Sequence, residues 1–504
     1  MVALKFLRNE KHSFLSMLLR KYYFLAFAFV ISLCSVQANN IQVQQAKLVE
    51  LDTISKSVYI QFDISWDNSW RSALGVANYD GAWIFAKYKP VNGNWKHITF
   101  STNLADYSIL NDNGVAATIE PSSTAKAALI YRTNSGDGTN NWQGIKLKWN
   151  YSYDDVPINQ EIVIQVFAIE MVYIPQGAFF LGSGGTGVSE FYTAGSNSPY
   201  LVQNENAITV SSANGNLYYN SSTYGGDRQG IVPALFPKGY KAFWCMKYEI
   251  TLEQYSDFLN TLTINQKATR FANNFNNKRN FIKLVNGVYG CDANNNSILN
   301  EADDGQNIAC NYLSWADGAA YADWAGLRAM TEFEYEKACR GTAAAVPDEF
   351  AWGTTTIIQA TDITNQNLST EVVSPDNANC VFGEILQGPV RVGNFARENS
   401  SKESAGASFY GVMDLTGNLW ERTVTIGNTK GRSFTNVHGN GSLDVNGNAD
   451  INKWPGIGAT GSGFRGGDWK YNSSYCKVSD RIISTNTSGG RNAGFGFRCV
   501  YGLP

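Results

Sequence analysis

The sequence predicts an all-β sandwich of immunoglobulin-like type, followed by a larger, loop-rich α+β domain. Three observations support this organisation: apolar and polar residues alternate between about Ile41 and Glu170, short helices with clear caps follow Met171, and the N-terminus is basic and then apolar. A chain of 504 residues is also too long for one ordinary core. We place a signal peptide at residues 1–38, the sandwich at 39–168 and the second domain at 169–504.

The N-terminal segment has the features of a secretory signal. Arg20 and Lys21 precede an apolar run over 22–33, and Val36-Gln37-Ala38 offers the small residues that a signal peptidase needs. The run is too short to span a bilayer comfortably, so we expect no transmembrane helix in the mature chain. The protein is therefore expected to be exported, whether periplasmic, at the cell surface or secreted.

The composition is globular and excludes several classes of partner. Aromatic residues are abundant, with 13 Trp, 26 Tyr and 27 Phe, and 47 Gly indicate a turn-rich chain with little helix. A net charge of −3 gives no indication of a nucleic-acid partner. Seven of the eight cysteines follow the predicted signal, an odd number that leaves at least one thiol unpaired within a monomer. Their spacing does not determine which cysteines pair.

The sandwich is predicted from alternation. Apolar residues alternate with polar ones at Val58, Ile60, Phe62, Ile64 and Trp66, as in a half-buried strand, and the pattern recurs at Ile145, Leu147, Trp149 and Tyr151. Trp66 and Trp70 could form a glycan-binding platform, but we favour core packing because aromatic residues dominate sandwich cores. We expect this region to close its own core and to fold independently.

The second domain opens with a strand at Met171–Pro175 and contains three capped helices. Capping-box patterns begin at Thr251, Ser314 and Thr331, and Gly341 is placed to end the third helix. Beyond residue 342 the chain reads as loops and short strands, so bound ions or disulfides are expected to support it.

Seven stretches of the second domain together resemble the formylglycine-generating-enzyme, or sulfatase-modifying-factor, family. They are MVYIPQGAFFLG (171–182), KYEITLEQYSDFL (247–259), LSWADGAAYADWAGLRAMTEFEYEKACRG (313–341), FAWG (350–353), YGVMDLTGNLWE (410–421), FRGGDW (464–469) and GFGFRCV (494–500). Each is loose alone, but all seven occur in the family's order. The resemblance covers roughly 171–502 and implies a C-type-lectin-like fold.

The resemblance also implies a copper site that this chain only half retains. In the enzyme, two cysteines five positions apart after Gly-Gly-Ser bind copper and oxidise a substrate cysteine to formylglycine. Here Cys476 matches the second cysteine, but Tyr471 stands at the first and Asp468 replaces the serine. A phenol cannot replace a thiolate for soft Cu(I), so copper is not expected. Trp420 matches the aromatic residue of the family's GNxWE motif and is, with Cys476, the remaining catalytic candidate.

The sequence lacks the residues that iron-dependent oxidation, triad-type hydrolysis or phosphate binding would require. Related iron-dependent sulfoxide synthases use a three-histidine site, whereas this chain has only His97 and His438 after the predicted signal. Those two histidines offer no nucleophile–histidine–carboxylate arrangement for hydrolysis. The glycines show no phosphate-binding GxxxxGK[ST] pattern.

Calcium is the cofactor that the resemblance favours. Family members hold calcium around GNxWE, and the matching groups are the carboxylates of Asp414 and Glu421 with the carbonyls of Gly417 and Leu419. The alternative is a plain Asx-turn with Glu421 in a salt bridge.

A second calcium signal precedes the helix that begins at Ser314. It resembles an EF-hand loop of the dockerin type, with the predicted ligands Asp292, Asn294, Asn296, Ile298 (carbonyl), Asn300 and Asp303. Ser297 takes the place of the usual glycine at position 6, where the loop turns sharply. The alternative is an Asn-rich surface loop.

Two classes of function remain open. We favour a non-catalytic, calcium-stabilised exported protein that binds an unidentified protein or glycan partner at the cell surface, because the cysteine pair is incomplete. The alternative is an oxidoreductase, formylglycine-generating or otherwise metal-dependent, that uses Cys476. Whether Cys476 is a free thiol in a cleft, or is buried or disulfide-bonded, discriminates between them. We expect it near the surface, because SSYCKVSD is a polar stretch.

Overall fold

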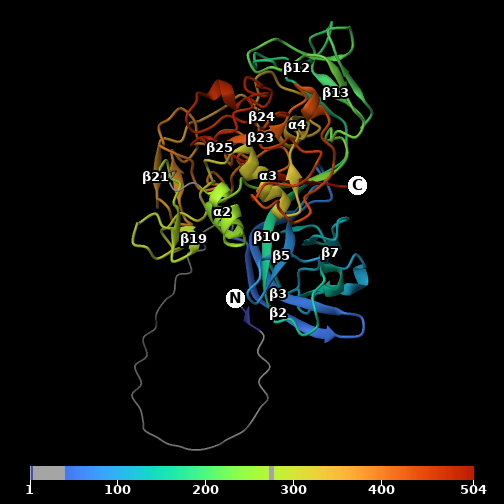
Figure 1. Ribbon diagram of the computed structural model, residues 1–504. Coiled ribbons are helices and arrows are strands. Elements are labelled where there is room, and N and C mark those ends of the chain that lie inside the picture. Colours follow the sequence, from blue (N-terminus) through green and yellow to red (C-terminus); the bar gives the residue numbers. More distant parts are fainter. Residues whose placement is uncertain (1, 4–39, 272–276) are drawn as a thin grey trace, which may run out of the picture.

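The computed structural model describes residues 2–3, 40–271 and 277–504, and these form a sheet-rich protein with few helices (Figure 1). Apart from β1 (Val2–Ala3), the predicted signal peptide lies outside the described residues. In the described part of the chain, no helix is both long and apolar enough to cross a bilayer.

The largest sheet joins both halves of the chain. Its order is β20-β26-β17-β10-β4-β8-β7, with β1 beside β10 and β5 beside β4. The bounds are β20 (Arg328–Ala329), β26 (Cys499–Gly502), β17 (Phe243–Met246), β10 (Ile162–Ile174), β4 (Asp80–Pro90), β8 (Ala128–Arg132), β7 (Ala117–Pro121) and β5 (Lys96–His97).

A second sheet packs against the N-terminal part of the first. Its order is β2-β3-β9-β6, with bounds β2 (Gln42–Asp52), β3 (Ser57–Arg71), β9 (Gly136–Trp149) and β6 (Tyr107–Ser108). The alternation predicted over 58–66 is confirmed, since these apolar residues are buried between the two sheets. Trp66 is 1% exposed and belongs to this core, as the favoured interpretation requires.

Strand β10 carries the large sheet across the predicted domain boundary. It pairs with β4 from Ile162 to Val172 and with β17 from Met171 to Ile174. The boundary placed between residues 168 and 169 therefore falls inside a strand. β4 shows why: Ile84 faces the sandwich core, whereas Trp83 and Phe85 face the core of the second region.

A buried ion cluster also joins the two regions. The ammonium of Lys247 lies 3.1 Å from the carboxylate of Glu170 and 3.3 Å from that of Asp80, and all three side chains are at most 5% exposed. The indole of Trp70 covers the ammonium at 5.0 Å. Both carboxylates come from the N-terminal strands, so the cation of the second region completes their pairing.

The three predicted helices are present with their predicted caps. They are α1 (Leu252–Asn260), α3 (Trp315–Trp324) and α4 (Glu332–Arg340), and each begins with a reciprocal capping box. Gly341 ends α4 with φ of +64°, a left-handed conformation that favours glycine. The remaining helices are α2 (Ile264–Arg270), α5 (Thr429–Arg432) and the 3₁₀ turns η1 (Leu104–Asp106), η2 (Tyr151–Asp154) and η3 (Ser473–Cys476).

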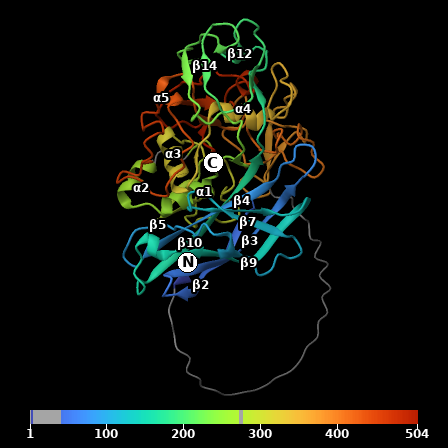
Figure 2. The ribbon, with the colours of Figure 1, turned by 90° about the vertical axis from the view of Figure 1, so that its right-hand side faces the viewer.

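The rest of the second region consists of small sheets and long loops. These sheets are β11 (Phe179–Leu181) with β13 (Tyr200–Val202); β12 (Phe191–Thr193), β15 (Leu217–Tyr219), β14 (Ile208–Val210) and β16 (Gly230–Val232); β18 (Ile282–Val285) with β19 (Val288–Cys291); β21 (Asp362–Thr364) with β22 (Val372–Ser374); and β24 (Ser462–Arg465), β23 (Trp420–Val424) and β25 (Phe495–Gly496). β12 and β14 lie at the end of the molecule opposite to β2 and β3 (Figure 2).

Buried ion pairs support these loops. The carboxylate of Glu332, on α4, forms salt bridges with Arg465 at 3.2 Å and Arg481 at 2.7 Å, and all three side chains are fully buried. Internal guanidinium–carboxylate pairs thus link β24 and the loop that carries Arg481 to α4, a role that we expected bound ions or disulfides to play.

Candidate functional site

The positions that the resemblance aligns with the copper site follow β24, with Tyr471 in a loop and Cys476 on η3. Gly466 and Gly467 have φ of +98° and +76°, which turn the chain sharply beneath η3. A Cβ atom on Gly467 would lie 2.5 Å from the Sγ of Cys476, so the cysteine thiol occupies the space that this glycine leaves. The Gly-Gly pair therefore positions Cys476.

The thiol of Cys476 is buried, contrary to the expectation drawn from its polar neighbours. Its residue is 0% exposed and packs with Cys380, Phe350 and Trp352. The polar side chain of Ser474 on the same 3₁₀ turn is exposed, while the cysteine faces inward. The two thiols are hydrogen-bonded, and burial together with Cys476 raises the pKa of Cys380 well above its usual range. The raised pKa disfavours a thiolate at Cys380, the thiol against which Cys476 packs.

Tyr471 is placed differently from the thiol. It is 45% exposed, and its ring centroid lies 5.2 Å from that of Tyr475 and 6.5 Å from that of Trp420. The indole N–H of Trp420 is buried without a hydrogen-bond partner. At the position that the resemblance aligns with the first cysteine, this chain therefore has a tyrosine in an aromatic cluster with Trp420 and Tyr475.

Asp468 places a carboxyl group beside this cluster. It is 1% exposed and accepts backbone N–H bonds from Lys470 at 3.1 Å and Tyr471 at 3.0 Å. Burial raises its pKa to about 7. Gly494 makes room for the carboxyl, because a Cβ there would lie 1.8 Å from one of its oxygens.

The predicted GNxWE calcium residues lie in a buried carboxylate cluster. The carboxylate of Glu421 accepts hydrogen bonds from Arg498 at 2.6 and 3.0 Å, and that of Asp414 accepts one from the Gly393 N–H at 2.6 Å. Burial raises the pKa of Asp414 to about 6. Sequence reasoning missed Glu249, which accepts from the Leu419 N–H at 3.1 Å. Burial and its carboxylate neighbours raise the pKa of Glu249 well above its usual range.

This arrangement fits an ion pair better than a calcium cage. Both carboxylate oxygens of Glu421 are engaged by the guanidinium of Arg498. Within 40–271 and 277–504, no group of three or more His, Cys, Asp and Glu residues is arranged to hold a metal ion. Calcium at Asp414, Gly417, Leu419 and Glu421 stays a prediction, and the geometry favours its salt-bridge alternative.

The loop over 292–303 has part of the expected shape. The carboxylate of Asp292 accepts the N–H groups of Asn296 and Ser297 at 3.0 and 3.2 Å, so the chain curls around the first predicted ligand. Ser297 has φ of +67°, the left-handed conformation for which the sequence pattern normally uses glycine. The ammonium of Lys283, however, lies 3.1 Å from the Asp292 carboxylate. The last predicted ligand, Asp303, accepts a bond from Asn294 at 3.2 Å.

The two histidines are structural and separate. His97 is buried beside the ammonium of Lys87 at 3.0 Å, and His438 accepts the Gly502 N–H at 3.0 Å. Burial lowers the pKa of both imidazoles well below the usual range. Neither is positioned with the other to bind a metal.

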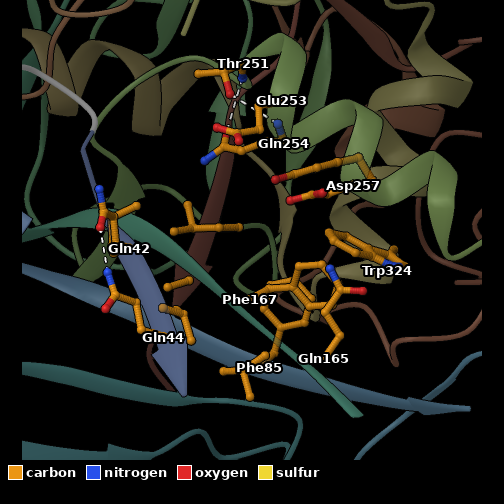
Figure 3. A pocket seen from close by; sticks show the side chains of 16 residues that line it. Gln42, Gln44, Phe85, Gln165, Phe167, Thr251, Glu253, Gln254, Asp257 and Trp324 are labelled. Carbon is orange, nitrogen blue, oxygen red and sulfur yellow. Dashed lines mark hydrogen bonds between the residues drawn. The ribbon is translucent and has the colours of Figure 1, made fainter. Parts of the chain in front are cut away.

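A cavity of about 430 Å³ lies between the large sheet and the helices (Figure 3). Glu253 and Asp257 line it from α1, and Gln165 and Phe167 face them from β10. The two carboxylates are one turn apart on the helix, and burial together with Glu253 raises the pKa of Asp257 to about 7. The cavity offers carboxyl and amide groups beside the ring of Trp324.

Comparison with known proteins places these features in a family context. The family model for sulfatase-modifying factor enzyme 1-like domains matches residues 193–503. The formylglycine-generating enzyme of Streptomyces coelicolor is 29% identical over 196 residues, which are 38% of this chain and 51% of that protein. The chain thus spans about half the length of this curated relative.

A relative that is described as inactive also matches. The mouse protein described as inactive C-alpha-formylglycine-generating enzyme 2 is 26% identical over 134 residues, 27% of this chain and 37% of that protein. Among solved structures, Treponema denticola variable protein 1 covers 67% of this chain and 96% of its own at 14% identity, with a TM-score of 0.33.

Proposed function

Because the chain belongs to the sulfatase-modifying factor enzyme 1-like family, we propose that it is an exported, non-catalytic member that acts as a binding or scaffold protein. The observation that carries this proposal is the state of the two copper-site positions. Residue 471 is a half-exposed tyrosine, and the thiol of Cys476 is fully buried against Cys380. Copper-dependent oxidation needs two accessible soft ligands at one point, and these residues do not supply them.

The proposed absence of catalysis is tested with a sulfatase-type peptide. Mature protein, copper and oxygen are incubated with the peptide, and mass spectrometry follows conversion of its cysteine to formylglycine. The Streptomyces coelicolor formylglycine-generating enzyme serves as the positive control. We expect no conversion; conversion by this protein would favour the alternative, an oxidoreductase that uses Cys476.

The aromatic cluster of Trp420, Tyr471 and Tyr475 is the surface that we propose for binding. The exposed ring of Tyr471, which packs beside Tyr475 above the buried Trp420, suits stacking against the flat apolar face of a sugar. A glycan array probed with the mature protein and with Tyr471→Ala tests this. Binding that the variant loses supports a glycan partner. Equal binding by both proteins places the site elsewhere, and no binding directs attention to a protein partner.

Calcium has a supporting role in this proposal. The loop over 292–303 curls around Asp292 in the manner expected of an EF-hand-like site, and its other predicted ligands are carboxamide, carbonyl and carboxylate oxygens. Calcium bound there would stabilise the loop between β19 and α3. Export supplies the calcium-rich surroundings that such a weak site needs.

A further inference from the structure

Cys380 and Cys476 lie on segments that are 96 positions apart in the sequence but are fastened side by side. Backbone N–H groups of Gly383 and Glu384 donate to the carbonyls of Tyr471 and Trp469 at 2.7 and 2.8 Å. Thr416 touches both cysteines: its carbonyl accepts from the Cys380 thiol at 3.3 Å, and its hydroxyl donates to the Cys476 carbonyl at 3.4 Å. The two thiols are therefore held together by the fold.

Their surroundings favour an uncharged sulfur group. Both cysteines are 0% exposed, and they share a cluster with Phe350 and Trp352. A Cu(I) ion bound to two thiolates would leave a net charge of −1 among these aromatic side chains, which is costly in a low-dielectric interior. A sulfur–sulfur bond carries no charge and needs no solvent.

Three of the other cysteines, Cys245, Cys339 and Cys499, have different surroundings. Cys245 pairs with Val500 across β17 and β26, so Cys499 points to the opposite face, and the two belong to different cores. Cys339 is hydrogen-bonded to Tyr335. The thiols of Cys380 and Cys476 are hydrogen-bonded to each other, and Cys291 and Cys310 lie near one another in the larger core.

We propose that Cys380 and Cys476 form a disulfide in the mature, exported protein. Each thiol loses a proton, the two sulfurs form one bond, and the two electrons reduce the disulfide of an exchange oxidant to two thiols. Because both thiols are buried in the folded chain, exchange takes place before the segment over 380–384 packs against 469–471. The bond removes Cys476 from any redox or metal chemistry and ties two long loops together.

The test is peptide mapping of full-length mature protein exported into an oxidising compartment. Free thiols are alkylated in denaturant without reduction, and the digest is read by mass spectrometry. We expect a linked peptide joining Cys380 to Cys476, and a protein lighter by two hydrogen atoms than its reduced form. Cys310→Ala, a matched buried control, should keep the link, whereas Cys380→Ser should leave Cys476 alkylated.

Wild-type mapping alone decides the proposal if a variant fails to fold. Recovery of both cysteines as alkylated peptides would overturn it, as would a link from either one to a third cysteine. Metal content of the same sample identifies the remaining possibility: free thiols with stoichiometric bound metal would show a metal site in place of the disulfide. Reduction should also lower the unfolding midpoint of the wild type by several degrees and leave that of Cys380→Ser unchanged.

Discussion

Tyr471, just before η3, and Cys476, the last residue of η3, have opposite environments. The phenol is 45% exposed beside Trp420 and Tyr475, whereas the thiol is 0% exposed beside Cys380. A substitution at residue 471 therefore changes the surface of the protein without changing where the thiol of Cys476 points.

Replacing the tyrosine by cysteine should not create a formylglycine-generating enzyme. Tyr471→Cys supplies the missing thiol, but Cys476 remains engaged with Cys380, and Asp468 adds a carboxyl group next to the site. We expect no conversion of a sulfatase-type peptide in the presence of copper, measured by mass spectrometry.

A triple variant tests whether Cys380 and Asp468 prevent activity once the missing thiol at residue 471 has been supplied. Tyr471→Cys combined with Cys380→Ala and Asp468→Ser restores the two thiols, frees the second one and removes the carboxyl group. Activity of the triple variant alone would support the explanation. Activity of the single variant would contradict it.

Asp468 should make stability depend on pH. Its folded pKa is raised from 3.8 to about 7 by burial, so the folded state binds a proton more tightly than the unfolded state. The contribution of Asp468 to the free energy of unfolding is therefore fully present below pH 3.8 and is lost as the pH rises toward 7. Asp468→Asn mimics the neutral acid and should be more stable than the wild type by about 1–3 kcal/mol at pH 8, with little difference at pH 4.

Urea unfolding at both pH values measures this difference. Asp362→Asn, at an exposed carboxylate on β21, serves as the control and should show no such dependence. An Asp468→Asn variant that is less stable than the wild type at pH 8 would mean that the ionised carboxylate is needed by its N–H donors.

At the scale of elements, the capped helices could be predicted from the sequence and the long-range pairings could not. The capping boxes at Thr251, Ser314 and Thr331 act within four residues, so local pattern was sufficient. α2 carries the same signal at Thr263 and was readable in the same way. Cys380 had no such signal, because only loop packing in three dimensions brings it to Cys476.

Residue type alone also left the calcium positions ambiguous. The resemblance selected Glu421 as a ligand, but the same carboxylate is suited to a guanidinium, and Arg498 lies 77 positions away in the sequence. This charge pairing requires that β23, which carries Glu421, lies close to Arg498, the residue just before β26. Burial and partner choice are properties of the assembled sheet, so sequence spacing could not decide between them.

The loop over 292–303 should respond to calcium. Calcium should raise the unfolding midpoint of the mature protein, and a chelator should lower it, because a ligand of the folded state stabilises by mass action. Asp303→Asn removes a predicted carboxylate ligand on the exposed side of the loop and should weaken this dependence. Differential scanning calorimetry at several calcium concentrations measures both.

Glu421→Gln is the matched comparison for the other predicted calcium position. If calcium acts through the loop, this variant loses stability by breaking the Arg498 pair but keeps its response to calcium. An unchanged midpoint with chelator, with calcium removal confirmed, would contradict calcium stabilisation at either position.

At the scale of the whole molecule, the sandwich and the second region share one sheet. Trp83, Phe85 and Phe167 of the N-terminal strands pack into the core that contains α1 and α3. A fragment over 39–168 would end inside β10 and expose this apolar face to water.

We therefore expect the fragment 39–168 to aggregate or to unfold without cooperativity, although the sequence predicts an independent fold. Size-exclusion chromatography and thermal unfolding monitored by circular dichroism test this, with the mature chain as the control. A soluble fragment that unfolds cooperatively would show that the sandwich core between the two sheets is sufficient.

Lys247 should be essential for joining the two regions. Lys247→Met leaves the carboxylates of Asp80 and Glu170 buried without their cation, and breaking a buried pair in this way costs about 3–5 kcal/mol. Chemical unfolding of the mature chain measures the loss. The triple variant with Asp80→Asn and Glu170→Gln should recover part of it, and failure to recover any would assign the loss to packing.

β10 also determines how the molecule can move. A hinge needs a few residues that absorb a change in backbone angles, but the connection here is a strand paired with β4 through Val172 and with β17 from Met171. Swinging the two regions would break the ladder and open the Lys247 cluster. The two regions therefore move as one rigid body: a force applied to β4 is carried to β17 and β26 through one hydrogen-bonded sheet.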